Sequence, residues 1–267
     1  MVTTFNNGAV HTTKHRIRHP FTIMIVMLFL ACASLTMLPS SAHALETKAQ
    51  NTDFEYPLAS SLSPFNTDWF MVDPNTGQFY NASGTTGWYD IADWDADKFA
   101  WKSTQTVHSG VNRAGAVEIQ IESGTSNHYA ELVCAQANTS IYQDITTVPG
   151  AVYRWSLNQC SLSKNFNDTM SVLVGTPTGT GTAQNATRLT SNGHGDATGY
   201  IGSVFGTTST NVAQRDHSTQ WEKYAGTFVC PEGQTETRLS FLSVTSPDST
   251  GGNLLDNITL DQAYPLF

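Results

Sequence analysis

Hydrophobic and polar positions alternate with a period of two over much of this chain. Val117, Ile119 and Ile121 alternate with polar residues, and so do Tyr153, Trp155 and Leu157. A period of two places successive side chains on opposite faces of a strand, so each run predicts a β-strand with one buried face. At least eight such runs occur, separated by turns rich in Gly, Pro and Asn and without a convincing helical pattern. They predict an all-β fold made of two antiparallel sheets packed as a sandwich.

Two stretches depart from this alternation. Residues 59–100 are irregular and rich in aromatic side chains, which indicates either a functional connection or several short strands. Residues 175–219 are rich in Gly, Thr, Ser and Asn, and they predict a long loop with at most short edge strands near Tyr200–Phe205. His194 and Asp196 fall in this loop, where we expect them to face solvent.

The N-terminus has the three parts of a secretory signal peptide. Three basic residues and no acid come first, residues 21–38 are almost wholly apolar, and Ala42-His-Ala44 supplies the small residues of a cleavage site. An uncleaved anchor is the alternative, because the apolar run approaches the length of about 20 residues that spans a bilayer. After cleavage we expect no membrane insertion and a secreted protein. The predicted parts are a signal peptide at 1–44, a polar leader at 45–50 and one domain at 51–267.

Charge narrows the possible partners of the mature chain. After residue 44 it carries ten basic and 22 acidic side chains, a formal net charge of −12. No basic stripe is present, so a nucleic-acid partner is not expected. The three mature cysteines are odd in number, which allows at most one internal disulfide, and their spacing does not choose the pair. These cysteines are Cys134, Cys160 and Cys230.

Several short segments, in this order along the chain, resemble a jelly-roll domain family of Gram-positive bacterial surface and secreted proteins, similar to carbohydrate-binding modules and also called galactose-binding-like. The segments are Asn51-Thr-Asp-Phe-Glu55, Lys98-Phe-Ala-Trp-Lys-Ser-Thr-Gln105, Tyr129-Ala-Glu-Leu132, Ile141-Tyr-Gln-Asp144, Tyr153-Arg-Trp-Ser-Leu157, Asp168-Thr-Met170, Thr190-Ser-Asn-Gly-His-Gly-Asp196 and Gly252-Asn-Leu-Leu-Asp256. The resemblance implies a jelly roll whose two ends close against each other. It supports the fold better than the function, because the ligands of that family are mostly unassigned.

The resemblance also implies a structural calcium ion that pins the two ends of the domain together. Its ligands would be the carboxylates of Glu55 and Asp256 with a backbone carbonyl of Asp53, since Ca²⁺ takes six to eight oxygen ligands. The alternative is that these acids only make hydrogen bonds at strand edges, without a metal.

Aromatic side chains beside acids and amides are the local chemistry of a sugar site. Trp88, Tyr89 and Trp94 share one loop with a cluster of aspartates, one of which is expected to cap a short helix near Asp97–Lys102. Arg154 and Asn158, on the polar face of a central strand, are further candidates for binding a glycan chain, or belong to an ordinary solvent face. By contrast, Trp101, Trp155 and Trp221 sit in strand patterns and are expected in the core.

Catalytic motifs are missing from the sequence. It contains no Gly-x-Ser-x-Gly elbow, His-Glu-x-x-His pair or phosphate-binding loop. The sequence therefore predicts a secreted, non-catalytic, carbohydrate-binding-like module at or near a bacterial cell surface, with a glycan or cell-surface polysaccharide as its partner. The alternative is a structural or adhesive domain that contacts envelope proteins and has no sugar site.

Overall fold

A computed structural model describes most of the mature chain. The described residues are 49–64, 68–82, 86–122, 125–162, 168–191, 197–205, 221–246 and 248–263. The chain divides into two units, Met1–Ala44 and Leu45–Phe267, and only the second contains described residues. The predicted signal peptide and the loop residues His194 and Asp196 lie outside them.

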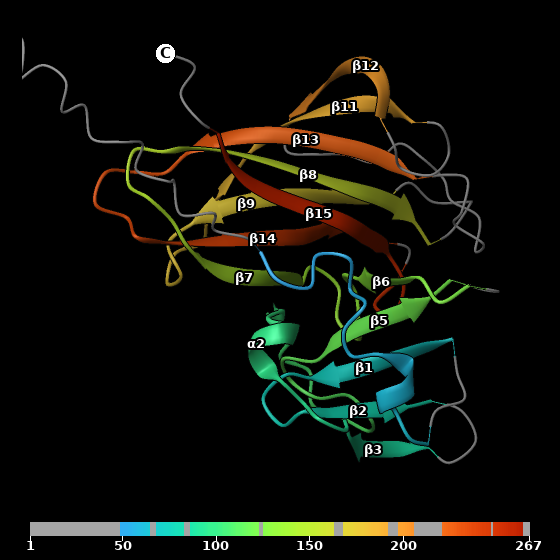
Figure 1. The fold of residues 1–267 in the computed structure, drawn as a ribbon. Coiled ribbons are helices and arrows are strands. Elements are labelled where there is room, and N and C mark those ends of the chain that lie inside the picture. The colour runs from blue at the N-terminus through green and yellow to red at the C-terminus, as the bar shows by residue number, and fades with distance from the viewer. Residues whose placement is uncertain are drawn as a thin grey trace, which may run out of the picture. The chain divides into compact units, whose positions relative to one another are not determined.

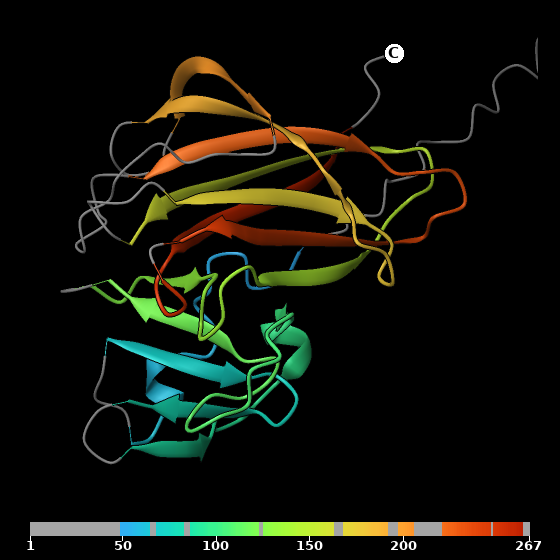
Figure 2. The same ribbon diagram turned by 180° about the vertical axis from the view of Figure 1, so that it is seen from behind.

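The larger of the two sheets has ten antiparallel strands among the described residues (Figures 1 and 2). In sheet order they are β12 (Ala197–Phe205), β11 (Asn185–Ser191), β13 (Glu222–Val229), β8 (Val152–Ser161), β15 (Asn253–Ala263), β6 (His128–Glu131), β5 (Val117–Ile121), β1 (Trp69–Asp73), β2 (Gln78–Asn81) and β3 (Gly87–Asp90).

The smaller sheet has five antiparallel strands and faces the β8–β15 half of the larger one. In sheet order they are β10 (Thr182–Ala183), β9 (Thr169–Gly175), β14 (Glu236–Thr245), β7 (Ser140–Thr146) and β4 (Lys102–Ser103). Helical structure in the described part is limited to a 3-10 turn, η1 (Ala59–Ser61), and to α2 (Ala96–Phe99). The predicted two-sheet antiparallel β-sandwich is confirmed.

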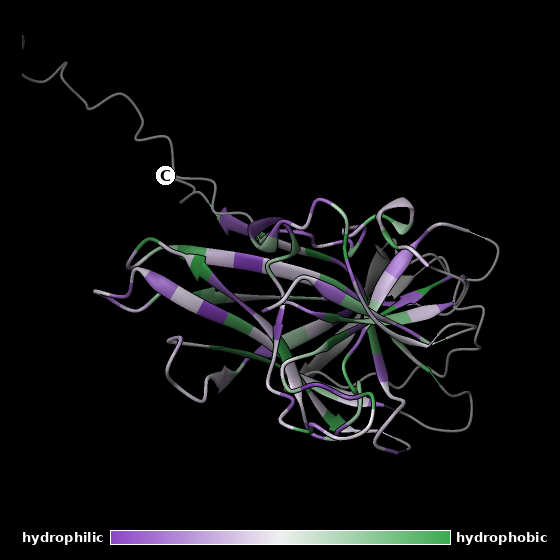
Figure 3. Cartoon of the chain, turned by 90° about the horizontal axis from the view of Figure 1, so that it is seen from below, coloured by the Kyte–Doolittle hydropathy of each residue, from purple (hydrophilic) through white to green (hydrophobic). Residues whose placement is uncertain are grey.

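The period-two alternation decides which side chains enter the core between the sheets. On β8, Tyr153, Trp155 and Leu157 are buried, whereas Arg154 is exposed on the other face. Figure 3 shows the same alternation of hydrophobic and hydrophilic positions along the long strands. Trp101, Trp155 and Trp221 are all buried, as the sequence predicted.

Two expectations about local structure need correction, and a choice between two alternatives is decided. Residues 175–219 are not one long loop, because β10, β11 and β12 lie within them. Threonine favours strands, and pairing with β9 and β13 supplies the hydrogen bonds that the sparse apolar pattern does not reveal. The helix that was expected near Asp97–Lys102 is α2, which begins one residue earlier and ends three residues earlier, with Asp95 as its N-cap. The irregular segment 59–100 resolves into the short strands β1 to β3, the second of its two alternatives.

The opening segment, residues 50–56, is not a strand although it lies beside the last one. Asn51 and Phe54 have left-handed backbone conformations (φ 48° and 56°), which extended pairing does not allow. The segment makes one ladder-like bond, from the Ile258 amide of β15 to the Thr52 carbonyl at 2.9 Å. The two ends of the domain therefore meet, as the resemblance implied, but through a turn.

All three mature cysteines are buried thiols. Cys134, Cys160 and Cys230 lie at separate places, and no disulfide joins any two of them in the described residues. The allowed single bridge is therefore not formed.

A pair of carboxyl groups is buried where β5 meets β6. Glu118 and Glu131 are cross-strand partners that are 6% and 1% exposed, and the side-chain amide of Gln120 donates to both. The Glu131 carboxylate also accepts from the Gly252 amide at 2.9 Å. Burial raises the pKa of Glu118 to about 8 and raises the pKa of Glu131 well above its usual value. At neutral pH the pair therefore retains a proton.

This pair predicts that the protein loses stability as the pH rises from 6.5 to 9. The pKa of Glu118 is 4.5 without burial and about 8 in the fold, so the folded state binds more protons in between and is favoured at the lower pH. The pKa of Asp256, raised by burial to about 7, acts in the same direction. Burial lowers the pKa of His128, so this residue makes the folded state more stable as the pH rises. That effect ends near pH 6.5 and therefore lies outside this window.

We expect the melting temperature to fall by roughly 3–6 °C across that window, since about 1–2 kcal/mol is lost and 1 kcal/mol corresponds to about 2–4 °C. E118Q, which keeps the shape of the side chain without its charge, should flatten the profile between pH 7 and 9. The exposed Glu236 provides the control, and E236Q should leave the profile unchanged. Scanning fluorimetry at each pH measures this, and a wild-type slope in E118Q would contradict the assignment.

Candidate functional site

The outer face of the five-stranded sheet carries one aromatic ring among hydroxyl groups. Cross-strand register aligns Tyr142 of β7, Ser240 of β14 and Leu173 of β9 in one row. The next row, Ile141, Phe241 and Val172, is buried in the core, so the Tyr142 row must face outward. The sheet thus presents Tyr142 on its outer face, on the strand next to the edge strand β4.

Arg238 is held against this ring. Its Nε and Nη2 donate to the two carboxylate oxygens of Asp144 at 2.7 and 2.8 Å, and its guanidinium carbon lies 3.9 Å from the centroid of the Tyr142 ring. The hydrogen bonds to Asp144 raise the pKa of Arg238 above its ordinary value, so the guanidinium stays charged. A two-point Arg–carboxylate contact fixes the plane of the guanidinium, so Arg238 is held stacked on one face of the Tyr142 ring, and we call this stacked pair the platform.

A groove of about 310 Å³ lies over this platform. One wall is the β9–β10 hairpin, where a Cβ on Gly175 would come within 2.7 Å of the Gly181 Cα, so only glycine permits the hairpin to fold this tightly. Such a volume lies at the lower end of the range of ligand sites. Most of the remaining lining residues carry hydroxyl groups: Thr104, Ser140, Thr176, Thr180 and Ser240. We call this the Tyr142 groove.

The structure does not bring Trp88, Tyr89 and Trp94 together. Trp88 and Tyr89 are neighbours on β3, so they point to opposite faces. The Trp88 ring lies under the guanidinium of Arg113, 4.0 Å from its centroid, and Trp88 Nε1 donates to a backbone carbonyl at 2.9 Å. Trp88 and Tyr89 are half-buried, and Tyr89 packs against the main core beside Phe79.

Trp94 lies on another surface again. It stacks on Tyr56 with ring centroids 5.8 Å apart and contacts Phe99 of α2. It also covers Gly77, where a Cβ would come within 2.4 Å of the indole. Its neighbouring acids are used locally, and Asp95 accepts the α2 amides of Asp97 and Lys98. Each of the three rings is engaged in packing at its own place.

Arg154 and Asn158 do share the outer face of the ten-stranded sheet, but their exposure differs. Arg154 is exposed and lines a second groove, whereas Asn158 is 4% exposed. Asn158 is the cross-strand partner of Asp256 on β15 and of Lys223 on β13. Of the two, only Arg154 is accessible to a ligand.

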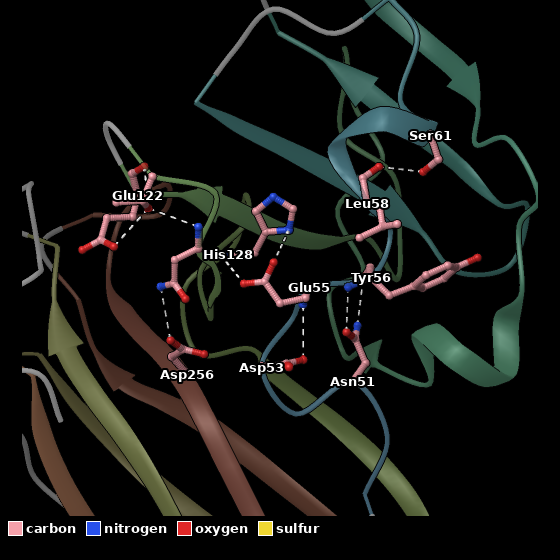
Figure 4. Close-up of polar contacts among 11 residues, drawn as sticks. Asn51, Asp53, Glu55, Tyr56, Leu58, Ser61, Glu122, His128 and Asp256 are labelled. Carbon is pink, nitrogen blue, oxygen red and sulfur yellow. Dashed lines mark hydrogen bonds and ion pairs between the residues drawn. The ribbon is translucent and has the colours of Figure 1, made fainter. Parts of the chain in front are cut away.

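The acids Asp53, Glu55 and Asp256 converge where the opening segment meets β6 and β15 (Figure 4). One Glu55 carboxylate oxygen accepts the His128 backbone amide at 2.9 Å, and the other lies 3.9 Å from His128 Nδ1. Asp256 accepts from the backbone amide of Asn257 at 2.7 Å and from the side-chain amide of Asn127 at 3.4 Å. Burial, and then the charges of Glu55 and Asp53, raise the pKa of Asp256 to about 7.

These acids already have protein hydrogen-bond donors. Across the described ranges, no group of three or more His, Cys, Asp or Glu side chains is arranged to hold a metal ion. The cluster supplies the charge and the oxygen atoms that Ca²⁺ prefers, but as arranged it uses them in hydrogen bonds.

No helix in the described ranges is long and apolar enough to cross a bilayer.

Sequence reasoning missed the Tyr142 groove. The segment Ile141-Tyr-Gln-Asp144 alternates, which puts Tyr142 and Asp144 on one face, and Arg238 alternates in the same way on β14. What the pattern does not contain is the β7–β14 register that places Arg238 opposite Asp144, 94 residues away.

Comparison with known proteins gives distant structural likenesses only. No protein-family model matches the chain, and no curated protein does. Among solved structures, a CBM4 module has a TM-score of 0.37 at 12% identity, covering 61% of this chain and 86% of its own. The CBM22-1 xylan-binding domain of Paenibacillus barcinonensis Xyn10C has a TM-score of 0.36 at 14% identity, covering 61% and 85%. TmCBM61, solved with β-1,4-galactotriose, has a TM-score of 0.28 at 12% identity, covering 81% and 99%. Likenesses this distant assign neither family nor ligand.

Proposed function

We propose that this chain is a secreted, non-catalytic, carbohydrate-binding protein that acts at or near a bacterial cell surface and holds a glycan in the Tyr142 groove. The observation that carries the proposal is the platform of Tyr142 and Arg238, fixed by Asp144 and surrounded by hydroxyl groups. Sugar rings pack their C–H faces on flat aromatic surfaces, and their hydroxyls pair with charged and hydroxyl side chains. The size of the groove suits a few sugar units of a longer chain.

The lining of the groove favours holding a sugar over cleaving one. Glycoside hydrolysis ordinarily uses two carboxyl groups on either side of the bond that is cut. Among the described residues that line the groove there is no Asp or Glu, and the neighbouring Asp144 is occupied by Arg238. The bound glycan would therefore leave unchanged.

Affinity electrophoresis and calorimetry of the purified protein against xylan, β-glucan, galactan and cell-wall polysaccharide test this proposal. Y142A removes the ring and should weaken binding by about tenfold or more, a loss of about 1.4 kcal/mol. Y142F keeps the ring and should retain most of the affinity. W88A is the matched control on a different surface and should bind like the wild type, with circular dichroism confirming the fold of each variant.

The contrary results are distinct. Loss of binding in W88A but not in Y142A would move the site to β3. Binding of an envelope protein by a wild type that binds no glycan would support the structural or adhesive alternative. Hydrolysis of any of the polysaccharides would contradict the non-catalytic part of the proposal.

We propose further that a structural Ca²⁺ stabilises the meeting point of the two ends, held by Glu55, Asp256 and Asp53. Its support is the convergence of three acids, because the charges of Glu55 and Asp53 add repulsion to the burial that raises the pKa of Asp256. A divalent cation would remove this repulsion, after exchange of the present hydrogen bonds for metal–oxygen contacts.

Calcium removal tests that second proposal. EDTA should lower the melting temperature of the calcium-loaded protein by roughly 5–10 °C, the effect of about 100-fold saturation on a domain of this size. D256N should abolish the response, whereas D261N, at an exposed site on the same strand, should keep it. Equal melting temperatures of the loaded wild type with and without EDTA would contradict the ion.

A further inference from the structure

A second groove of about 670 Å³ lies on the outer face of the ten-stranded sheet. Its floor is a row of cross-strand partners that runs over β11, β13, β8 and β15. The four residues of this row are Thr187, Ala225, Ser156 and Thr259. We call it the Arg154 groove. It shares no lining residue with the Tyr142 groove, and at one end it also contacts Thr182 and Ala183 of β10.

The groove opens where β11 leaves β13. Pairing between these strands ends at Thr187 and Ala225, while β13 continues along β8 to Val229. Beyond that point the backbone of Asn185 passes over Gly226, where a Cβ would lie 2.6 Å from the Asn185 carbonyl oxygen and 2.3 Å from the Trp155 ring. Glycine at 226 is therefore required for β11 to cross here, and the crossing forms one end of the groove.

The lining is suited to a polyhydroxylated ligand. Hydroxyl groups come from Ser156, Thr187, Thr227 and Thr259, and amides from Gln184 and Asn185. Trp155 also borders the groove, but its side chain points into the core, so it offers no polar group to a ligand on the outer face.

The charged group in this lining is Arg154. Each of the other described arginines lies beside a carboxylate: Arg113 by Asp73, Arg188 by Glu222 and Arg238 by Asp144. Arg154 is exposed, and none of the described residues forms an ion pair or hydrogen bond with its guanidinium, including the side chain of its cross-strand partner Asp261. A guanidinium presents paired N–H donors that match a carboxylate, so Arg154 is available for an acidic ligand.

We propose that the Arg154 groove is a second carbohydrate site, selective for acidic polysaccharides, in which Arg154 pairs with the carboxylate of a uronic acid unit. The inference shares the ligand class of the proposed function but rests on separate residues. With one groove on each sheet, the protein binds a neutral and an acidic chain at once. The overall negative charge of the mature chain disfavours anionic polymers, so binding of an acidic chain depends on the local positive charge of Arg154.

Polygalacturonate and its methyl ester form a matched pair of probes, because the ester keeps the sugar chain and removes the charge. We expect the wild type to bind polygalacturonate about tenfold more tightly than the ester. R154A should reduce polygalacturonate binding to the level of the ester, and A225W, which fills the floor of the groove, should abolish both. Y142A should leave both affinities unchanged. Calorimetry measures these affinities, and thermal melting verifies that each variant is folded.

Each result separates the two proposals. Undiminished polygalacturonate binding in R154A, or equal affinity of the wild type for acid and ester, would overturn the second site. If Y142A loses polygalacturonate binding and R154A keeps it, the second site is also overturned, and the acidic chain is assigned to the Tyr142 groove. Binding that depends on Arg154, in a protein that binds no neutral glycan, would support the Arg154 groove and count against the Tyr142 groove.

Discussion

The opening segment, residues 50–56, fills the gap where β6 and β15 separate, and both sheets depend on it. These two strands pair only through Leu254 with Glu131 and Leu255 with Ala130. Beyond those pairs the segment takes over, as its Thr52 carbonyl accepts from β15 and its Glu55 carboxylate accepts from β6. On the other sheet, the Gln143 side chain of β7 exchanges two hydrogen bonds with the backbone of Gln50. The opening segment therefore makes hydrogen bonds to strands of both sheets.

Aromatic stacking anchors this closure in the core. Phe54 is fully buried and stacks on Trp101 at 5.2 Å, and Trp101 contacts Phe241 of β14 at 5.9 Å. Trp101 Nε1 also donates to the Asn51 carbonyl at 2.8 Å, which satisfies the indole while it holds the turn. Burial of these rings offsets the left-handed backbone that the turn requires. Most of the aromatic residues noticed in the sequence are used in packing of this kind, whereas the half-buried Tyr142 lines a groove.

The segment from Gly175 to Leu189 shapes both outer faces. Its first half folds back on β9 as the hairpin that walls the Tyr142 groove, and its second half crosses to the other sheet and edges the Arg154 groove. Between the two halves, the backbone amide of Gln184 donates to the backbone carbonyl of Val172 on β9 at 2.9 Å. A stretch with few apolar residues can do this because glycine allows close crossings and threonine suits exposed strands. Its composition resembles that of a loop, so its role could not be predicted.

The sequence by itself determined the all-β class, the buried faces of strands such as Tyr153-Arg-Trp-Ser-Leu157, the core position of Trp101 and the excess of negative charge. The resemblance to jelly-roll domains further implied that the two ends of the domain meet. Only the tertiary structure decided that Arg238 meets Tyr142, that Trp88 and Trp94 lie apart, and that Glu118 faces Glu131. The reason is physical. Alternation reports whether a side chain is buried, whereas strand order and register, which choose its neighbours, arise from contacts between residues far apart in the chain.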